Sequence, residues 1–246
     1  MSLRIATFNV HGWRDARWED NAARVSALLR EHAVDVVGLQ EVEGGPLHAI
    51  AAENGLHVSR NVLGCALLSR FPIVAQGPLS TREGGRRRAL RNRALCATLD
   101  VGGEALRLVV LHLDHVDESR RLRELAAVRH GLRDLSPRPS LWLGDFNALT
   151  REDYSPRAWV QIAQVRERNR WEAPHTQVTA QMKSLGFTDC WEVAGRETPV
   201  STCRFDTRID YLWADPALLS RWSVSRCRAI PSDASDHRMV LLELEG

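Results

Sequence analysis

The chain has 246 residues, 44% of them hydrophobic and 26% charged, a composition typical of a globular protein with a proper core. Its formal net charge of +2 is too small to indicate a polyanionic partner by itself. Arginine carries nearly all of the positive charge, which phosphate binding and an arginine-rich genome explain equally well. The five cysteines are scattered and form no C-x-x-C pair, which argues against a zinc site or a disulfide framework.

Apolar periodicity predicts strands and short helices in the first half of the chain. Expected there, in chain order, are a strand at residues 3–9, a helix at 19–32, a strand at 35–41, a helix at 45–55, and strands at 64–70 and 73–79. Residues 81–93 begin as a polar loop, and residues 93–115 are predicted to form a hairpin that turns at Gly102 and Gly103.

The second half begins with an amphipathic helix at 118–132 and a core strand at 139–146. Residues 150–186 are polar and helical, with buried positions expected at Trp159, Ile162, Val165, Val178 and Met182. Strands return at 208–214, 221–230 and 238–245.

Strands dominate this order, and hairpins outnumber tight βαβ repeats. The pattern favours an α/β fold, a four-layer α/β sandwich in which two mixed, mostly antiparallel β-sheets pack face to face with helices outside. Neither an internal repeat nor a linker interrupts it, so a single domain over residues 1–246 is the economical interpretation.

Polar side chains terminate most of the predicted strands. One such residue needs no special explanation, because strands must end, but this set contains only Asn, Asp, Glu and His. If the strands lie side by side, these side chains converge at one edge of the sandwich. The set comprises Asn9, Glu41, His112, Asp114, Asp145, Asn147, Asp210, Asp236 and His237.

These residue types suit hydrolysis of a phosphate ester with a hard divalent cation. Carboxylate and carboxamide oxygens without thiols select Mg²⁺ or Mn²⁺ over zinc. Histidine can donate a proton or a hydrogen bond to a phosphoryl oxygen near neutral pH. A metal ion, a histidine and a positioned carboxylate together provide what in-line hydrolysis needs.

Six motifs in order resemble the series of the endonuclease/exonuclease/phosphatase superfamily, the deoxyribonuclease-like metal-dependent phosphoesterases. They read TFNVHGW, LQEVEG, LHLDH, LGDFNA, RIDYLW and SDHRMV, and the resemblance covers residues 3–243. It implies a hydrolase, and the superfamily includes nucleases, tyrosyl-DNA phosphodiesterases, sphingomyelinases and inositol polyphosphate phosphatases.

The resemblance also implies roles for individual residues. Glu41 would be the chief metal ligand, with Asn9 close beside it and Asp236 completing the site. Asp145 would orient or deprotonate the attacking water, and Asn147 would hold a phosphate oxygen.

Two histidines complete the implied machinery. His237 would contact the phosphate in the transition state, and Asp210 would fix its tautomer. His112 would be the second phosphate-binding histidine, as in the deoxyribonuclease-like branch, whereas AP endonucleases commonly have tyrosine there.

Three further residues are expected at the substrate. Asp114 is either directly involved or a supporting hydrogen-bonding group. Arg88 lies in an arginine run at 82–93 that could track a nucleic-acid backbone, or that could be an ordinary solvated loop. Tyr154, like Trp159 and Trp171, could stack on a base or an aromatic leaving group, although core packing is favoured for Trp159.

The sequence therefore predicts a phosphodiesterase, most simply a nuclease acting on nucleic acid. The alternatives are a phosphomonoesterase or a phospholipid or inositol phosphate phosphoesterase, and, in another class, a catalytically silent homologue that binds nucleic acid or protein. The chain begins MSLRIATFNV, which leaves no room for a signal peptide, so a cytoplasmic location is expected. No apolar window is long enough for a membrane segment, and no protein partner is evident.

Overall fold

Two six-stranded β-sheets form the centre of the protein. The structure is a computed structural model that describes residues 1–83, 86–89, 93–133, 135–196 and 200–246, with only the backbone given for 80–83 and 86–89. The first sheet has the order β13-β14-β1-β2-β4-β3. Its strands are β1 (Ser2–Asn9), β2 (Val36–Gln40), β3 (His57–Val58), β4 (Ala66–Ser69), β13 (Ser223–Ile230) and β14 (Met239–Glu245).

The second sheet has the order β11-β12-β10-β9-β8-β5. Its strands are β5 (Ile73–Pro78), β8 (Ala94–Val101), β9 (Glu104–His112), β10 (Ser140–Asp145), β11 (Thr188–Asp189) and β12 (Asp210–Ala214). Each sheet holds one parallel pair, β1 with β2 and β9 with β10, while the other pairings are antiparallel. The predicted pair of mixed, mostly antiparallel sheets is confirmed.

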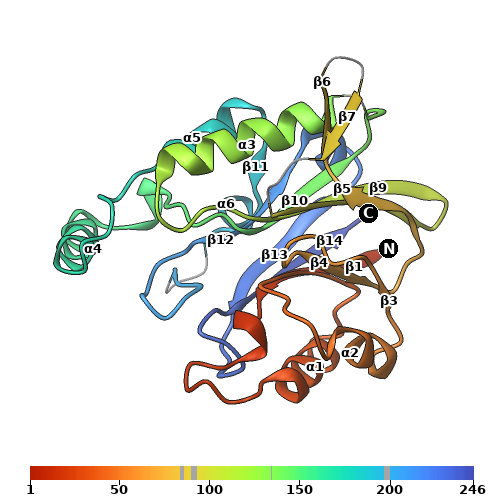
Figure 1. Cartoon of the computed structure of the whole chain (residues 1–246), viewed down its shortest axis with the longest axis horizontal. Coiled ribbons are helices and arrows are strands. Elements are labelled where there is room, and N and C mark those ends of the chain that lie inside the picture. Colours follow the sequence, from red (N-terminus) through yellow and green to blue (C-terminus); the bar gives the residue numbers. More distant parts are fainter. Residues whose placement is uncertain (84–85, 90–92, 134, 197–199) are drawn as a thin grey trace.

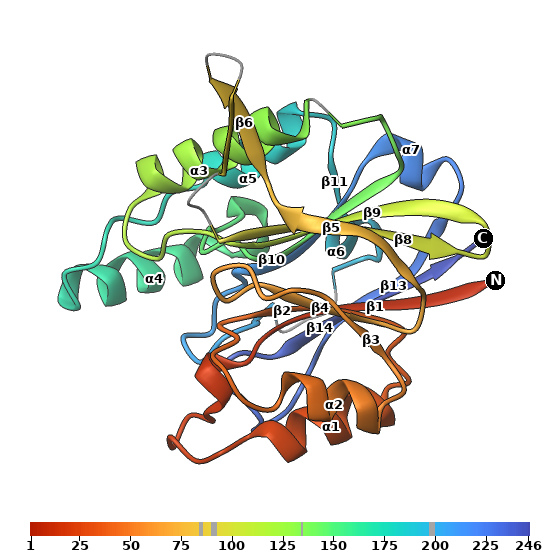
Figure 2. The same cartoon turned by 45° about the vertical axis from the view of Figure 1, so that its right-hand side comes forward.

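Helices cover the outer faces of both sheets, which gives four layers (Figure 2). α1 and α2 lie against the first sheet, and α3 and α5 lie against the second, while α4 projects beyond the edge of the layers (Figure 1). The helices are α1 (Ala22–Glu31), α2 (Leu47–Glu53), α3 (Glu118–Leu132), α4 (Pro156–Arg168), α5 (Gln177–Ser184), α6 (Cys190–Val193) and α7 (Pro216–Leu219), with 3-10 turns η1 (His11–Trp13) and η2 (Arg151–Asp153). No helix of the described residues is both long and apolar enough to cross a membrane.

Three apolar layers hold the sandwich together. The middle layer fills the space between the sheets, with Ile5 of β1 and Leu143 of β10 among its members. The outer layers join each sheet to its helices, with Phe8 on the α1 side and Trp142 on the α3 side. Both faces of the central strands are therefore buried, which explains their continuous apolar sequences.

The sheets approach closely at Gly38 in β2. A Cβ atom at this position would lie 2.9 Å from Leu143 Cδ1 and 3.0 Å from Val110 Cγ2, closer than side chains tolerate. The absent side chain lets β2 of one sheet pack directly on β9 and β10 of the other.

Two predictions are wrong in detail. Residues 81–93 were expected to begin as a loop, but β6 (Ser80–Glu83) and β7 (Arg86–Ala89) form a separate antiparallel hairpin in which Thr81 pairs with Arg88. The arginine run hides this hairpin, because it has no alternation of apolar and polar residues. In α4, Trp159, Ile162 and Val165 are only half-buried rather than core residues.

The remaining helical region agrees with expectation. Val178 and Met182 of α5 are buried, as predicted. The helix predicted at 118–132 coincides with α3, which starts where the Asp117 side chain accepts a hydrogen bond from Arg120 N. The two-residue strands β3 and β11 and the one-turn helices α6 and α7 were not predicted, because they are too short to produce a periodic signal.

Candidate active site

The site lies where the inward-facing rows of both sheets turn from apolar to polar. In β10 the row runs through Leu141 and Leu143 to Asp145, and in β1 it runs through Ile5 to Asn9. Successive residues of a strand point to opposite faces, so both polar side chains continue the row that fills the space between the sheets. They meet there, since Asn9 Nδ2 donates a hydrogen bond of 3.2 Å to Asp145 Oδ2.

Strand pairing in the second sheet brings three site residues to one edge. β9 and β10 are parallel, so their carboxyl ends coincide and Asp145 pairs with His112. β12 runs the other way, and its first residue, Asp210, pairs with Asp145 on the opposite side. Gly144, which precedes Asp145, has φ +147°, and a Cβ atom there would lie 2.0 Å from Leu111 O. Position 144 can therefore hold only glycine.

Glu41 enters the site from the first sheet. It follows β2, whose last residue, Gln40, pairs with Asn9 of the parallel strand β1. Asn9 Nδ2 donates to Glu41 Oε1 at 3.0 Å as well as to Asp145, so one carboxamide joins the carboxylates of the two sheets. Glu41 has φ +54°, a left-handed conformation that costs a non-glycine residue about 1–3 kcal/mol. The surrounding contacts therefore hold this carboxylate in place against strain.

Asp145 is the carboxylate of the site whose pKa is shifted furthest from its ordinary value. It is 2% exposed, and its Oδ1 accepts a hydrogen bond of 2.9 Å from Asn147 N. Burial and the nearby Asp210 carboxylate raise the pKa of Asp145 from 3.8 to about 7, although His237 and the hydrogen bonds from Asn147 and Asn9 oppose this rise. A carboxylate with a pKa near 7 can accept a proton at neutral pH.

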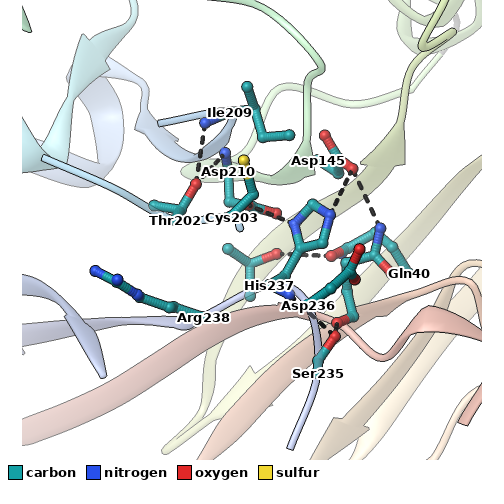
Figure 3. A network of polar contacts seen from close by, with 12 residues as sticks. Gln40, Asp145, Thr202, Cys203, Ile209, Asp210, Ser235, Asp236, His237 and Arg238 are labelled. Atoms are coloured by element: carbon teal, nitrogen blue, oxygen red, sulfur yellow. Dashed lines mark hydrogen bonds and ion pairs between the residues drawn. The ribbon is translucent and has the colours of Figure 1, made fainter. Parts of the chain in front are cut away.

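His237 lies between two of these carboxylates, as Figure 3 shows. Its Nδ1 donates to Asp210 Oδ2 at 3.0 Å, which leaves Nε2 facing Asp145 Oδ2 at 3.9 Å. Burial lowers the pKa of His237, but the Asp210 carboxylate outweighs burial and raises this pKa well above 6.5. His237 is therefore a fixed cation whose second N–H points into the site.

Two hydroxyl groups that the sequence did not single out position this pair. Ser235 Oγ donates to Asn9 O at 2.8 Å and accepts from His237 N at 3.2 Å, so it ties the SDH segment to β1. Thr202 Oγ1 accepts from the backbone N of Ile209 and of Asp210 at 3.0 and 3.2 Å (Figure 3). Short loops rich in Ser and Thr beside a predicted site residue are the only sequence signal for them.

His112 has the opposite protonation state from His237. Its Nδ1 lies 3.3 Å from Arg93 Nη1, and because a guanidinium only donates, this nitrogen accepts and the proton is on Nε2. Nε2 faces Glu41 Oε1 and Asp145 Oδ2, both at 3.8 Å. Burial, followed by the charges of Arg93 and His237, lowers the pKa of His112 to about 3. His112 is a neutral hydrogen-bond donor, and Arg93, which precedes β8, is the residue that orients it.

Asp236 has an unsatisfied oxygen that suits a cation. Its Oδ1 and His11 Nδ1 are buried without a hydrogen-bond partner among the described residues, although the two atoms lie 3.7 Å apart. Asp236 Oδ2 lies 3.6 Å from Arg204 Nε. Glu41, Asp145 and Asp236 thus bring three carboxylates to one cavity, and their oxygens are the donors that Mg²⁺ or Mn²⁺ prefers.

The cavity is open and has a volume of about 1320 Å³. Asn147 lines it with φ +48°, and its Nδ2 donates to Leu113 O at 3.0 Å. Tyr154 also lines it, but its hydroxyl accepts a hydrogen bond of 2.8 Å from Arg208 N.

The other two residues expected at the substrate are Asp114 and Arg88. Asp114 Oδ1 accepts from the backbone N of Val116 and Asp117 at the start of α3, and it is absent from the described lining. The side chain of Arg88 lies outside the described part of the structure. Among the residues whose side chains are described, the structure thus brings together the expected site residues from Asn9 to His237, except Asp114.

Comparison with protein-family models gives a match over nearly the whole chain. The model of the Endonuclease/Exonuclease/phosphatase family matches residues 6–237. No curated protein matches the sequence.

Solved structures share the fold over the whole chain. A mannosyl-6-phosphatase of Bacteroides thetaiotaomicron is 18% identical with a TM-score of 0.73, covering 99% of this chain and 100% of that one. D. rerio TDP2 complexed with single strand DNA product is 15% identical with a TM-score of 0.67, covering 100% and 99%. A family protein of B. thetaiotaomicron is 18% identical with a TM-score of 0.71, covering 99% and 98%.

The family is generally dependent on divalent metal ions, and the chain carries a buried acidic cluster. The family match covers nearly the whole chain and is accompanied by the expected fold. The chain therefore belongs to the endonuclease/exonuclease/phosphatase family of phosphoester hydrolases.

Proposed function

We propose that this protein is a divalent-metal-dependent phosphodiesterase that hydrolyses nucleic acid by in-line attack of an activated water. The observation that carries the proposal is that the Asp145 carboxylate lies beside a neutral hydrogen-bond donor, Asn9, and a cationic one, His237. Asn9 bonds Asp145 at 3.2 Å, and the cationic His237, oriented by Asp210, faces it at 3.9 Å. A proton acceptor and a fixed proton donor thus face the same end of one open cleft.

Asp145 is the proposed base. Its pKa of about 7 is close to the pH at which it would act, where a carboxylate of ordinary pKa would be a weak acceptor. The hydrogen bond from Asn147 N holds one oxygen, so that the other faces the reacting water.

The two histidines are proposed to bind the phosphoryl group in different ways. His237 donates from Nε2 to a phosphoryl oxygen as a cation, and Asp210 prevents rotation of its ring. His112 donates from Nε2 as a neutral imidazole, because Arg93 occupies its Nδ1. The side chain of Asn147 contacts a further phosphate oxygen.

Glu41, Asn9 and Asp236 would hold the Mg²⁺ or Mn²⁺ ion. When bound, the ion supplies positive charge for the phosphoryl oxygens. Asp145, Asp210 and His237 also lie within ligand distance of one another, with one ligand atom of each within 4.8 Å of the others. Asp210 Oδ1 is unsatisfied like Asp236 Oδ1, but Asp210 Oδ2 accepts from His237, so Glu41 and Asp236 are the proposed ligands and Asp210 is left to orient the histidine.

A phosphomonoesterase is the second candidate, favoured by the similarity to a protein described as a mannosyl-6-phosphatase. The cleft of about 1320 Å³ is open and larger than one sugar phosphate requires, which favours an extended substrate. A cytoplasmic location is part of the proposal, because the five cysteines are buried free thiols.

The test is a substrate panel with single-stranded and duplex DNA, RNA, bis(4-nitrophenyl) phosphate, mannose 6-phosphate and inositol phosphates. We expect hydrolysis of phosphodiesters that EDTA abolishes and Mn²⁺ restores. Asp145→Asn and His237→Ala should lower kcat/KM by about 10²- to 10⁴-fold. His57→Ala, which changes an exposed histidine of β3 outside the cavity lining, is the matched control and should have no effect.

Hydrolysis of the sugar phosphate alone would favour the phosphomonoesterase. If no phosphoester is cleaved with any divalent ion, the protein is a binding homologue without catalysis.

A further inference from the structure

Helix α4 presents an apolar stripe to the cleft instead of to the core. Ala158, Ile162 and Val165 follow the spacing of one helical face and line the cavity. No residue of α4 is fully buried, and Val160 on another face is 54% exposed. An amphipathic helix normally buries its apolar stripe against the protein. Here the stripe forms one wall of the space that holds the catalytic residues.

Two exposed aromatic rings extend this wall. Trp171 and Phe205 are 44% and 47% exposed, and both line the cavity. Their rings meet edge to face, with centroids 4.9 Å apart and an interplanar angle of 79°. They come from distant segments of the chain, so their contact is a tertiary feature. We call the surface formed by Ala158, Ile162, Val165, Trp171 and Phe205 the aromatic wall.

The aromatic wall is joined directly to the catalytic end. Arg204 N donates to Asp236 O at 2.9 Å, and the preceding Cys203 pairs with His237 in an isolated β-bridge. Arg204 Cζ lies 4.8 Å from the centroid of the Phe205 ring. Phe205 therefore lies two residues after the position that pairs with His237, and both residues line the same cavity.

A buried ionic network fixes Trp171 in position. Glu172 accepts from Glu118 N at 2.7 Å and bonds Arg121, which is 2% exposed, while its carbonyl accepts from Arg166 at 3.3 Å. Trp171 N donates to Arg166 O at 2.9 Å. Exposed aromatic rings held on a rigid backbone lose little conformational entropy on binding, which is the property of a binding surface.

We propose that the aromatic wall is a subsite for an unpaired nucleobase next to the scissile phosphate, so that the enzyme acts on single-stranded nucleic acid. The inference rests on the proposed function. A flat heterocycle stacks on aromatic faces, and the exposed arginines Arg170 and Arg204 in the same cavity suit the flanking phosphates. A duplex keeps its bases stacked inside, where the wall cannot reach them. An acyl chain would need an enclosed tunnel rather than an open wall flanked by guanidinium groups.

The test compares two strands of equal length and charge, an oligothymidylate and a base-free strand of tetrahydrofuran units. The wild-type protein should prefer the base-bearing strand, both in kcat/KM and in binding measured by fluorescence anisotropy in EDTA. Trp171→Ala and Phe205→Ala should each lower kcat/KM for the base-bearing strand by about 5- to 150-fold, the range for one stacked base. The base-free strand should be unaffected.

Val160→Ala, on another face of the same helix and outside the cavity lining, is the matched control and should change neither strand. Both aromatic rings are exposed, so thermal unfolding should verify that the variants fold.

Three results would overturn the inference. The first is equal binding of both strands by the wild-type protein, and the second is an equal loss for both strands in the variants. The third is binding to phosphatidylserine vesicles that the variants lose while strand binding is unchanged, which would assign the wall to lipid. If the wild-type protein binds the base-bearing strand more tightly in EDTA but hydrolyses no phosphoester, the base-binding role of the aromatic wall is supported and only the proposed function is refuted.

Discussion

Replacing Asp145 with asparagine should stabilise the metal-free protein at pH 8 although it greatly lowers kcat/KM. Asp145 is 2% exposed and lies near the Asp210 carboxylate, so its ionised form is unfavourable in the absence of a cation. Asparagine has nearly the same shape and carries no charge. The carboxylate that the proposed chemistry needs therefore lowers the free energy of unfolding of the metal-free protein.

The pKa of Asp145 sets the size and the pH dependence of this cost. The carboxyl has a pKa of about 7 in the folded chain and 3.8 in the unfolded one. Since the folded state binds the proton more tightly, the free energy of unfolding falls as pH rises from 3.8 to 7 and is constant above that range. At about 1.4 kcal/mol for each pH unit, the loss is about 2 kcal/mol at pH 5 and about 4 kcal/mol at pH 8.

The asparagine variant has its own cost, because its NH₂ group meets the amide nitrogen of Asn9 or of Asn147. This unsatisfied donor costs about 1–3 kcal/mol, and it does so equally at both pH values. The difference in unfolding free energy between variant and wild type should therefore grow by about 2–3 kcal/mol from pH 5 to pH 8.

Urea unfolding in EDTA at pH 5 and pH 8 measures this difference. Asp233→Asn, which changes a side chain that is 88% exposed, is the control and should show no growth with pH. Excess Mn²⁺ should reverse the order at pH 8, because the ion stabilises the ionised wild-type site. A variant that is destabilised by the same amount at both pH values would refute the charge argument.

Three further predictions concern the neighbours of Asp145. Asp210→Asn removes the carboxylate that raises the pKa of His237, so an alkaline loss of kcat/KM should appear near neutral pH, with the titration of the ring followed by NMR. Arg93→Met removes one cause of the low pKa of His112, which should rise above about 3 in the same experiment; an unchanged value would show that Arg93 does not contribute to it. Adding Mn²⁺ to EDTA-treated protein should raise the melting temperature, by an amount equivalent to about 2.7 kcal/mol at a hundredfold excess over Kd, and Glu41→Gln should lose this rise.

The sandwich and the convergence of its strand ends could be predicted because both depend on local patterns. In β10 the alternation of Leu141, Leu143 and Asp145 already assigns the carboxylate to an inward row. Once β9 and β10 are known to be parallel neighbours, their carboxyl ends coincide and Asp145 lies beside His112. Periodicity, residue type and strand direction are properties of short segments.

The state of each site residue could not be predicted, because it depends on contacts between distant segments. Two histidines that follow or precede strands have opposite protonation states, since His112 faces Arg93 and His237 faces Asp210. Nothing in the LHLDH and SDH motifs distinguishes them. The protonation state of each ring follows from its tertiary neighbours alone.

Helix α4 shows a second limit of prediction from sequence, which concerns what an apolar helix face packs against. The spacing of Ile162 and Val165 predicts an apolar face but not what covers it, and the same pattern suits a core or a binding wall. The wall depends on a network in which Glu118, Arg121 and Glu172 join α3 to the segment after α4. Trp171 and Phe205 are exposed and lie outside the strands, so they can change without altering the strand pairing that assembles the catalytic groups. Structures that share this fold over nearly the whole chain at 15–18% identity include one described as a mannosyl-6-phosphatase and one complexed with single strand DNA product, so the shared strand ends do not by themselves fix the substrate.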